Sequence, residues 1–244
     1  MSLLRILVAR EFAAYFATPL ALIFLLVFLV LAAALPLYMG GFYENEQADL
    51  QVFFAFHPWL YLLLLPALGM RLWSEERRSG SIELLMTLPV ATGWLVLGKF
   101  LAAWLFAGLA LVLTFPMVLT VNFLGSPDNG AILAGYLGSL LLAGAFLAVS
   151  TCLSVVSKSP VVAFISALVV CFVCVVAGHG MVLDAFRGWA PQAWLDLLAS
   201  MSFLTRFQAI SRGVLDVRDL LFFTSFIACW LLANAVLLEL KKAD

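Results

Sequence analysis

Residues 131–156 read AILAGYLGSLLLAGAFLAVSTCLSVV, a run of 26 residues that contains no charged side chain. A helix needs about 20 predominantly apolar residues to cross the hydrocarbon core of a bilayer. The run also lacks the strict alternation of apolar and polar residues that a strand of a transmembrane barrel shows. This stretch therefore predicts a transmembrane helix.

Five further runs of the chain meet the same requirement. They cover residues 19–39, 52–72, 94–121, 160–178 and 219–239. The chain of 244 residues is 65% hydrophobic and 11% charged, whereas soluble domains carry roughly 25% charged residues. The sequence therefore predicts an all-α integral membrane protein, a single domain over residues 1–244 with six transmembrane helices.

Residues 1–17 precede the first predicted span. They do not resemble a cleavable signal peptide, because the apolar stretch that follows is too long. Apolar residues such as Leu7 and Phe12 recur at helical spacing, with Arg5 and Arg10 toward the other side. We expect an amphipathic helix that lies in the membrane interface. The alternative is a plain extension of the first span.

The basic residues predict the orientation of the spans, since Lys and Arg favour cytoplasmic loops. With the N-terminus inside, the cytoplasmic segments hold nine basic residues: Arg5, Arg10, Arg71, Arg77, Arg78, Lys99, Lys158, Lys241 and Lys242. The outside segments then hold four, all of them in the last linker: Arg187, Arg206, Arg212 and Arg218. We therefore expect both termini in the cytoplasm.

The predicted spans hold no ionisable group near their middles, which argues against an ion-driven carrier and an intramembrane protease. His57 lies near the outer end of the second span, where we expect a hydrogen-bonded or interfacial histidine, with a proton relay as the alternative. Cys171 and Cys174 lie inside an apolar run, so we expect them to pack rather than to bind metal. We expect no catalytic residue and no metal site in this chain.

The densest charge lies in residues 70–99, MRLWSEERRSGSIELLMTLPVATGWLVLGK, between the second and third spans. Gly80 allows a turn, Ser81 is a candidate N-cap, and residues 82–88 form a short helix with an apolar side that Pro89 ends. Such a helix is suited to docking in a groove of a partner protein. The alternative is a solvated loop whose basic residues contact anionic lipid.

Residues 93–100, GWLVLGKF, match the phosphate-loop pattern G-x-x-x-x-G-K-[ST] except at Phe100. A working loop needs flexible backbone after a strand and a hydroxyl for Mg²⁺. Here the intervening residues are bulky, and the chain runs on into the bilayer. We therefore expect no nucleotide binding. Lys99 instead marks the cytoplasmic boundary of the third span, where its charge can reach headgroups or loop acids, and Gly98 allows a neighbouring helix to approach.

The linker at residues 179–218 has helical periodicity and many aromatic residues, but it is too polar and too broken by Gly188, Pro191 and Gly213 to be a seventh span. We expect one or two short helices there. They either dip back into the outer leaflet or lie flat on it.

Two segments resemble a known family. Residues 70–99 are similar to the signature of ABC-2 type exporter membrane subunits, in which the second span runs into E-[RK]-x-x-G-[TS]-x-E-x-L-x-x-x-P and later L-G-K. The matching residues are Glu76, Arg77, Gly80, Ser81, Glu83, Leu85, Pro89, Leu97, Gly98 and Lys99. Ser81 stands where threonine is commoner. Residues 213–219 resemble the pattern G-[VI]-[IL]-D-x-R-D that precedes the last span in the gliding-motility-type branch of that family.

The resemblance covers essentially the whole chain and implies a half-transporter in a bacterial inner membrane. Its partners would be two cytoplasmic ATPase subunits, which carry the ATP and Mg²⁺, and a second copy of itself or a similar permease. It implies no cofactor on this chain and no nucleic acid. The ATPase-coupling interface would comprise Glu75, Glu76, Arg77, Arg78, Gly80, Ser81, Glu83 and Leu85. The outer gate or re-entrant region would comprise Phe203, Phe207, Arg212, Gly213, Asp216 and Arg218.

Three functions are compatible with these features. The leading hypothesis is the membrane subunit of an ABC exporter. The first alternative is an ABC-type complex that transmits force or signals to periplasmic auxiliary proteins without moving a substrate. The second alternative is a membrane scaffold or channel unrelated to ABC proteins. The cargo is not indicated, because apolar spans suit lipids, amphipathic molecules and polymers equally.

Overall fold

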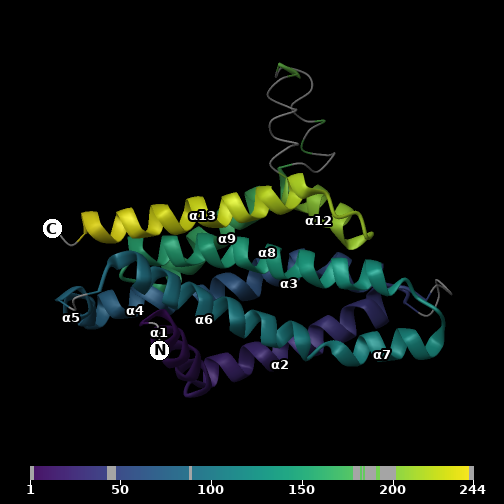
Figure 1. Ribbon diagram of the computed structural model, residues 1–244, viewed down its shortest axis with the longest axis horizontal. Coiled ribbons are helices and arrows are strands. Elements are labelled where there is room, and N and C mark those ends of the chain that lie inside the picture. The colour runs from purple at the N-terminus through teal and green to yellow at the C-terminus, as the bar shows by residue number, and fades with distance from the viewer. Residues whose placement is uncertain are drawn as a thin grey trace.

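The computed structural model is an elongated bundle of helices (Figure 1). It describes residues 3–42, 48–87, 90–177 and 202–241, and single positions at 182, 184, 191 and 192. Within these residues there is no strand, which confirms the predicted all-α fold. Residues 178–201, apart from those single positions, lie outside the described residues, and they include about half of the predicted linker at 179–218. Residues 43–47, Leu88 and Pro89 also lie outside the described residues.

The described helices follow one another along the chain. Their bounds are α1 Leu3–Phe16, α2 Pro19–Ala34 with a π-helical end Leu35–Met39, α3 Gln51–Gly69, α4 Arg71–Ser79, α5 Ser81–Thr87, α6 Thr92–Val112, α7 Phe115–Leu124, α8 Asn129–Val156, α9 Pro160–Val176, α12 Phe203–Ser211 and α13 Val217–Leu240.

Five stretches are long and apolar enough to cross a membrane: Ala21–Met39, Gln51–Ser79, Thr92–Leu124, Asn129–Val156 and Val217–Leu240. A sixth apolar helix, α9, is shorter, with 17 residues. Each of these helices overlaps one of the runs that the sequence singles out. The chain is therefore a multi-span membrane protein, and the count of six spans stays a prediction.

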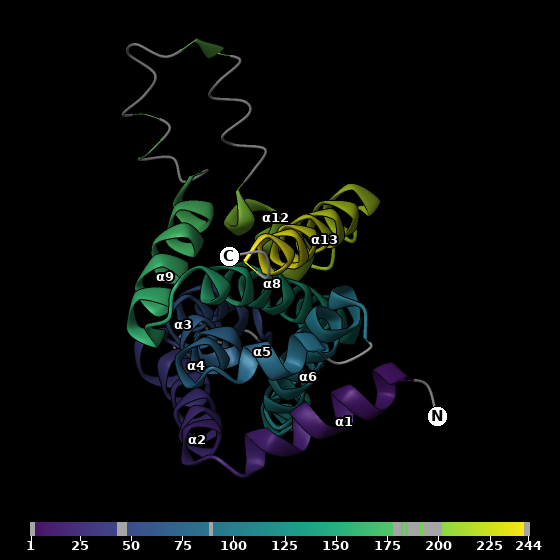
Figure 2. The ribbon, with the colours of Figure 1, turned by 90° about the vertical axis from the view of Figure 1, so that its left-hand side faces the viewer.

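The helix α8 is the axis of the bundle. Figure 2 looks along the long axis and shows α8 surrounded by α3, α6, α9, α12 and α13. In its spanning part, 83% of the residues are buried within the chain, against 17% in α13. The helix α8 is therefore mostly enclosed by other helices. The outer helices such as α13 have apolar surface that no other helix covers, and this surface is suited to contact with lipid.

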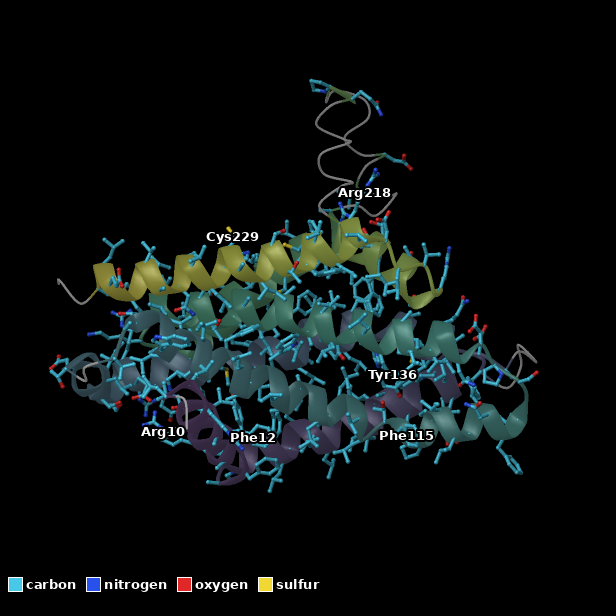
Figure 3. All side chains as sticks on the ribbon, in the orientation of Figure 1. Arg10, Phe12, Phe115, Tyr136, Arg218 and Cys229 are labelled. Atoms are coloured by element: carbon cyan, nitrogen blue, oxygen red, sulfur yellow. The ribbon has the colours of Figure 1, made fainter. Side chains whose placement is uncertain are left out.

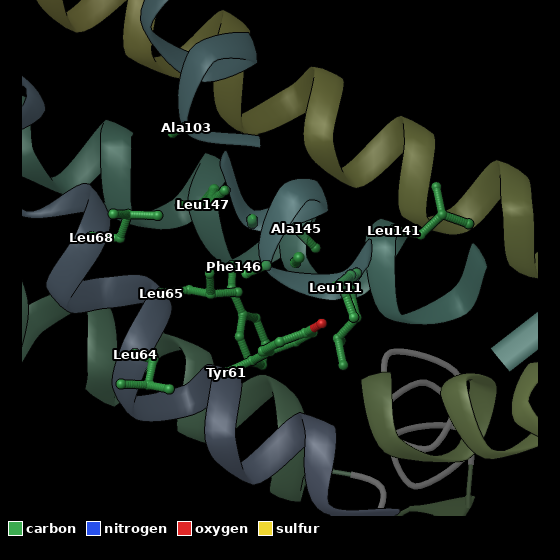
Figure 4. Close-up of a cluster of buried hydrophobic side chains, with 14 of the residues drawn as sticks. Tyr61, Leu64, Leu65, Leu68, Ala103, Leu111, Leu141, Ala145, Phe146 and Leu147 are labelled. Atoms are coloured by element: carbon green, nitrogen blue, oxygen red, sulfur yellow. The ribbon is translucent and has the colours of Figure 1, made fainter. Parts of the chain in front are cut away.

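The contact between α3 and α8 forms much of the core. Figure 4 shows Tyr61 and Leu65 of α3 facing Phe146 of α8, with Leu111 of α6 beside them. The two helices approach closely at Gly69, where an added Cβ atom would lie 2.5 Å from the Cβ of Ser150. The lack of a side chain at this position therefore sets the distance between the two helices.

The charged helices gather at one end of the bundle, which we call the charged end. It comprises α1, α4, α5 and the C-terminal end of α13 (Figure 1). The helix α4 follows α3 with only Met70 between them, so the second span and the charged segment form one nearly continuous stretch. The opposite end, which we call the far end, holds the α7–α8 connection and α12.

The close approach at Gly69 yields a prediction on stability. Gly69→Ala should lower the free energy of unfolding by about 1–3 kcal/mol, because the new methyl group overlaps the backbone-proximal Cβ of Ser150 rather than a flexible side-chain tip. The measurement is the loss of soluble, correctly sized protein on heating in detergent. Gly93→Ala is the matched control, since an added Cβ there meets no atom within 4 Å. Equal thermal stability of the two variants would contradict the packing argument.

Candidate functional site

The predicted coupling segment consists of two helices, α4 and α5, joined at Gly80. Gly80 has φ of 75°, in the left-handed region that glycine adopts without steric cost, and it ends α4. The predicted short helix begins at Ser81 itself and runs to Thr87. Ser81 therefore does not stand outside the helix as a cap, and its hydroxyl donates a hydrogen bond to the carboxylate of Glu76.

The ammonium group of Lys99 lies between two carboxylates at the charged end. Its Nζ is 3.2 Å from Oε2 of Glu11 on α1 and 3.2 Å from Oε1 of Glu76 on α4. It also lies 5.3 Å from the ring centroid of Trp73, which is fully buried. The side chain of Lys99 is only 7% exposed, against 15% for Glu11 and 26% for Glu76. We call this set of charges the Lys99 triad.

The triad sets the charge state of Glu11. Burial would raise the pKa of this carboxyl group, but the charges of Lys99 and Arg10 and the hydrogen bonds that they donate hold its pKa below the ordinary value. Glu11 is therefore ionised at neutral pH, and it ties α1 to the third span. Three elements, α1, α4 and α6, meet at one buried cation.

A second interaction joins α4 to the central helix. Nη1 of Arg77 donates to the backbone oxygens of Val155 and Val156, at 2.5 and 3.1 Å. Nζ of Lys241, at the end of α13, donates to the same two oxygens at 3.1 and 2.9 Å. The last carbonyl groups of a helix lack partners within it and carry its negative partial charge. Two cations from α4 and α13 therefore cap the end of α8.

The remaining residues of the predicted coupling interface lie on the surface. Glu75, Arg78 and Glu83 are exposed, and Leu85 is half-buried. Glu75, with the Lys99 triad, also lines a crevice of about 320 Å³ between α1 and α4. The structure thus divides the predicted set. Glu76, Arg77 and Ser81 order the segment from within, while Glu75, Arg78, Glu83 and Leu85 are available to a partner.

Gly98 adjoins this site. An added Cβ at Gly98 would lie 3.1 Å from the Cβ of Leu7, so the glycine allows α1 to lie close against α6. Leu7 is buried, whereas the neighbouring Ile6 is 51% exposed. The face of α1 that carries Leu7 and Glu11 is therefore the one that packs on the bundle.

The predicted outer region lies at the far end, where an ion pair joins α12 to α13. Arg206 on α12 lies 2.5 Å from Oδ1 of Asp219 on α13 and 4.3 Å from the ring centroid of Phe222. Phe203 and Phe207 are buried in the core.

The connection from α12 to α13 uses the other predicted residues of this region. Gly213 has φ of 89° and follows the end of α12. The carboxylate of Asp216 accepts a hydrogen bond from the backbone nitrogen of Arg218 at 2.9 Å and caps α13. Arg212 and Arg218 are exposed. Gly213 and Asp216 therefore shape the turn, and the two arginines face outward.

His57 is part of the core. It is fully buried, and its Nδ1 lies 2.7 Å from Oγ of Ser139 on α8. Among the described residues, no group of three His, Cys, Asp or Glu side chains could hold a metal ion. The expectation that this chain carries no catalytic residue stays a prediction.

The clusters include residues that the sequence does not predict as site residues: Glu11 and Trp73, Arg206 and Lys241, which enter only the count of basic residues, and Asp219, which enters only the pattern at residues 213–219. Glu11 carries a signal that could have been noticed, since it is the one acid in an otherwise apolar and basic N-terminal helix. Helical spacing places it on the same face as Leu4, Leu7 and Val8. An acid on an apolar face requires a buried cation nearby.

Comparison with known proteins identifies a family and a relative. Residues 7–238 match the family model described as ABC-2 family transporter protein. The chain is also 38% identical over 114 residues to Heme exporter protein B of Pseudomonas aeruginosa, and the aligned part covers 46% of this chain and 49% of that protein. The alignment thus spans about half the length of that relative. Neither match tests the likeness to the gliding-motility-type branch, which stays a prediction.

The Lys99 triad yields a prediction. Lys99→Met leaves Glu11 and Glu76 without their common cation and should destabilise the protein by about 3–5 kcal/mol, the usual cost of breaking a buried ion pair from one side. Heating in detergent measures the loss, and limited proteolysis reports release of α1. Combining Lys99→Met with Glu11→Gln and Glu76→Gln should recover part of the lost stability, since no unpaired charge is then buried.

Arg10→Gln is the control for this prediction. Its side chain is 56% exposed, and its pairing with Glu11 lies at the surface, so the change should cost less than about 1 kcal/mol. If Lys99→Met proves no more harmful than Arg10→Gln, the triad does not hold α1 in place.

Proposed function

Since the chain belongs to the ABC-2 transporter family as a membrane subunit, we propose that it couples ATP hydrolysis by a separate cytoplasmic ATPase to export across a bacterial inner membrane. The observation that carries the proposal is the division of the α4–α5 segment. One set of its residues is tied to the spans, and another set is exposed at the charged end.

The exposed set supports docking of the ATPase. Glu75, Arg78 and Glu83 present charges of both signs on two short helices, and Leu85 adds an apolar contact. Mixed charge around an apolar contact is typical of a docking surface that a partner recognises by complementary charge. In this proposal the charged end faces the cytoplasm, and two ATPase subunits bind a pair of membrane subunits there.

The inward set supports transmission of the motion. A displacement of α4 acts on α8 and α13 through Arg77 and Lys241, because both cations share the carbonyl groups of Val155 and Val156. It acts on α6 and α1 through Lys99 and Glu11. The segment therefore moves together with four helices rather than as a separate loop. ATP and Mg²⁺ would stay on the ATPase subunits.

The relative named Heme exporter protein B favours heme as a cargo of this chain. His57, the one histidine among the described residues, is buried and is not accessible as an axial ligand in this conformation. We propose heme or a similar flat amphipathic molecule as the first cargo to test. In inside-out vesicles that contain the complex, ATP should drive accumulation of heme, read by its absorbance in the lumen. Hydrolysis without accumulation of any tested cargo would favour the alternative of a force-transmitting complex.

The coupling assignment predicts the effect of charge reversal. Glu75→Arg with Arg78→Glu should reduce co-purification of the ATPase subunit at least about tenfold, because exposed complementary charges turn repulsive, while membrane insertion is unchanged. Leu85→Pro should do the same by breaking α5. The readouts are the amount of ATPase subunit retained and its rate of ATP hydrolysis.

Lys158→Glu is the matched control for charge reversal. Lys158 is exposed in the α8–α9 connection, at the same end of the bundle but outside α4 and α5. ATPase retention should survive this change. Loss of retention in all three variants, or in none, would refute the assignment of α4–α5 as the docking element.

The orientation of the chain yields a further prediction. Ser79→Cys at the charged end should react with a membrane-impermeant maleimide only from the cytoplasmic side, and Ser126→Cys at the far end only from outside. Both positions are exposed. Cys229, which is exposed on α13, is replaced by Ser in the starting protein. The opposite labelling pattern would place the ATPase-docking surface on the wrong side of the membrane.

A further inference from the structure

An apolar groove of about 990 Å³ lies on the outside of the bundle between α1, α6 and α8. Its lining includes Leu4 and Phe12 of α1, Leu105 and Gly108 of α6, and Leu140 of α8. Figure 2 shows that α1 extends sideways past α6, so the N-terminal half of α1 overhangs the bundle. The groove is the space under this overhang.

The wall of the groove is apolar. Its two polar aromatic side chains, Trp104 and Tyr136, both form hydrogen bonds within the chain. Nε1 of Trp104 donates to the backbone oxygen of Leu140 at 2.8 Å. The hydroxyl of Tyr136 lies 2.8 Å from Oγ1 of Thr114. Because both groups are already bonded within the chain, the wall is suited to a hydrocarbon chain rather than to a polar ligand.

The groove has the depth of one membrane leaflet. Along α6 it runs from Leu101 to Val112, which corresponds to about 17 Å at the rise of an α-helix. The hydrocarbon core of a bilayer is about 30 Å thick. Figure 3 shows Phe12 near the charged end and Tyr136 farther along the long axis. The groove therefore reaches from the charged end to about the middle of the membrane.

Arg5 stands at the charged end of the groove and belongs to its lining. Its side chain is exposed, and it has no ion pair or hydrogen bond among the residues that the structure describes. Arg10, one and a half turns later, is by contrast paired with Glu11 at 2.6 Å. A free guanidinium group above an apolar slot of leaflet depth matches the phosphate and the acyl chain of one lipid molecule.

We propose that this groove binds one anionic phospholipid of the leaflet at the charged end, with its phosphate on Arg5 and an acyl chain along α6 and α8. The lipid fills the space under α1 and holds the helix against the bundle in addition to the Lys99 triad. The chain thus has a specific lipid site in addition to its general contact with the bilayer.

Native mass spectrometry of the purified complex tests the proposal. The complex, stripped of lipid in detergent, is titrated with phosphatidylglycerol or phosphatidylcholine. We expect one retained phosphatidylglycerol per chain, and weaker retention of phosphatidylcholine. Arg5→Gln should lower phosphatidylglycerol retention about fivefold, the effect of one basic residue at an anionic surface, and lower phosphatidylcholine retention less, because the choline group offsets the charge of its phosphate. Arg10→Gln should leave both unchanged. Equal effects of Arg5→Gln and Arg10→Gln would overturn the headgroup assignment.

A second variant tests the groove itself. Gly108→Leu places a side chain in the groove, and the backbone tolerates the added Cβ, whose nearest neighbour is Cδ1 of Leu140 at 3.4 Å. It should reduce the retention of both lipids, whereas Gly93→Leu on the same helix should not. Unchanged lipid retention in Gly108→Leu overturns the proposal. Loss of self-association with unchanged lipid retention would instead identify the groove as an interface between two copies of the chain.

Discussion

The burial of the Lys99 ammonium group is the constraint on which the charged end depends. A cation that is 7% exposed must be paired, since an unpaired charge in an apolar setting is strongly disfavoured. Glu11 and Glu76 supply the two negative charges from helices on either side. The position of α1 against the third span, and the position of α4 beside it, both follow from this requirement. A change in any of the three helices therefore affects the other two.

The same end contains a second constraint of a different kind. A helix that ends near the membrane surface leaves its last carbonyl groups without partners, and in α8 those groups are bonded by Arg77 and Lys241. The central helix α8, the predicted coupling segment and the last helix α13 are thus joined at one point. Together with the Lys99 triad, this arrangement supports the proposal that a short surface segment moves a tightly packed bundle. The segment is bonded to the helices, so its motion would not need to deform the core.

Much of the fold is predictable from the sequence, because membrane-spanning helices are marked by their own composition. The runs at 131–156 and 219–239 nearly coincide with α8 and α13. The turn at Gly80 and the short helix after it are also predictable from local rules. The pairings of the site are not. Glu11 and Lys99 are 88 positions apart. Neither hydropathy nor spacing indicates which acidic residue pairs with a lysine at the boundary of a span. Whether Arg77 faces a partner or the bundle is likewise decided by where α8 ends.

The near-match to a phosphate loop at residues 93–100 shows why local pattern and chemistry differ. In a phosphate loop the lysine must be free to reach a phosphate, and the preceding backbone must present its N–H groups to the ligand. Here residues 93–99 lie within α6, so from the second turn onward their N–H groups are engaged in helical hydrogen bonds. The charge of Lys99 is already neutralised by two carboxylates. Gly98 of the pattern allows α1 to approach α6, and Lys99 forms the triad that holds α1 there. A residue pair that binds nucleotide in one backbone conformation thus serves, within a helix, to join a membrane span to the segment that we propose receives motion from an ATPase.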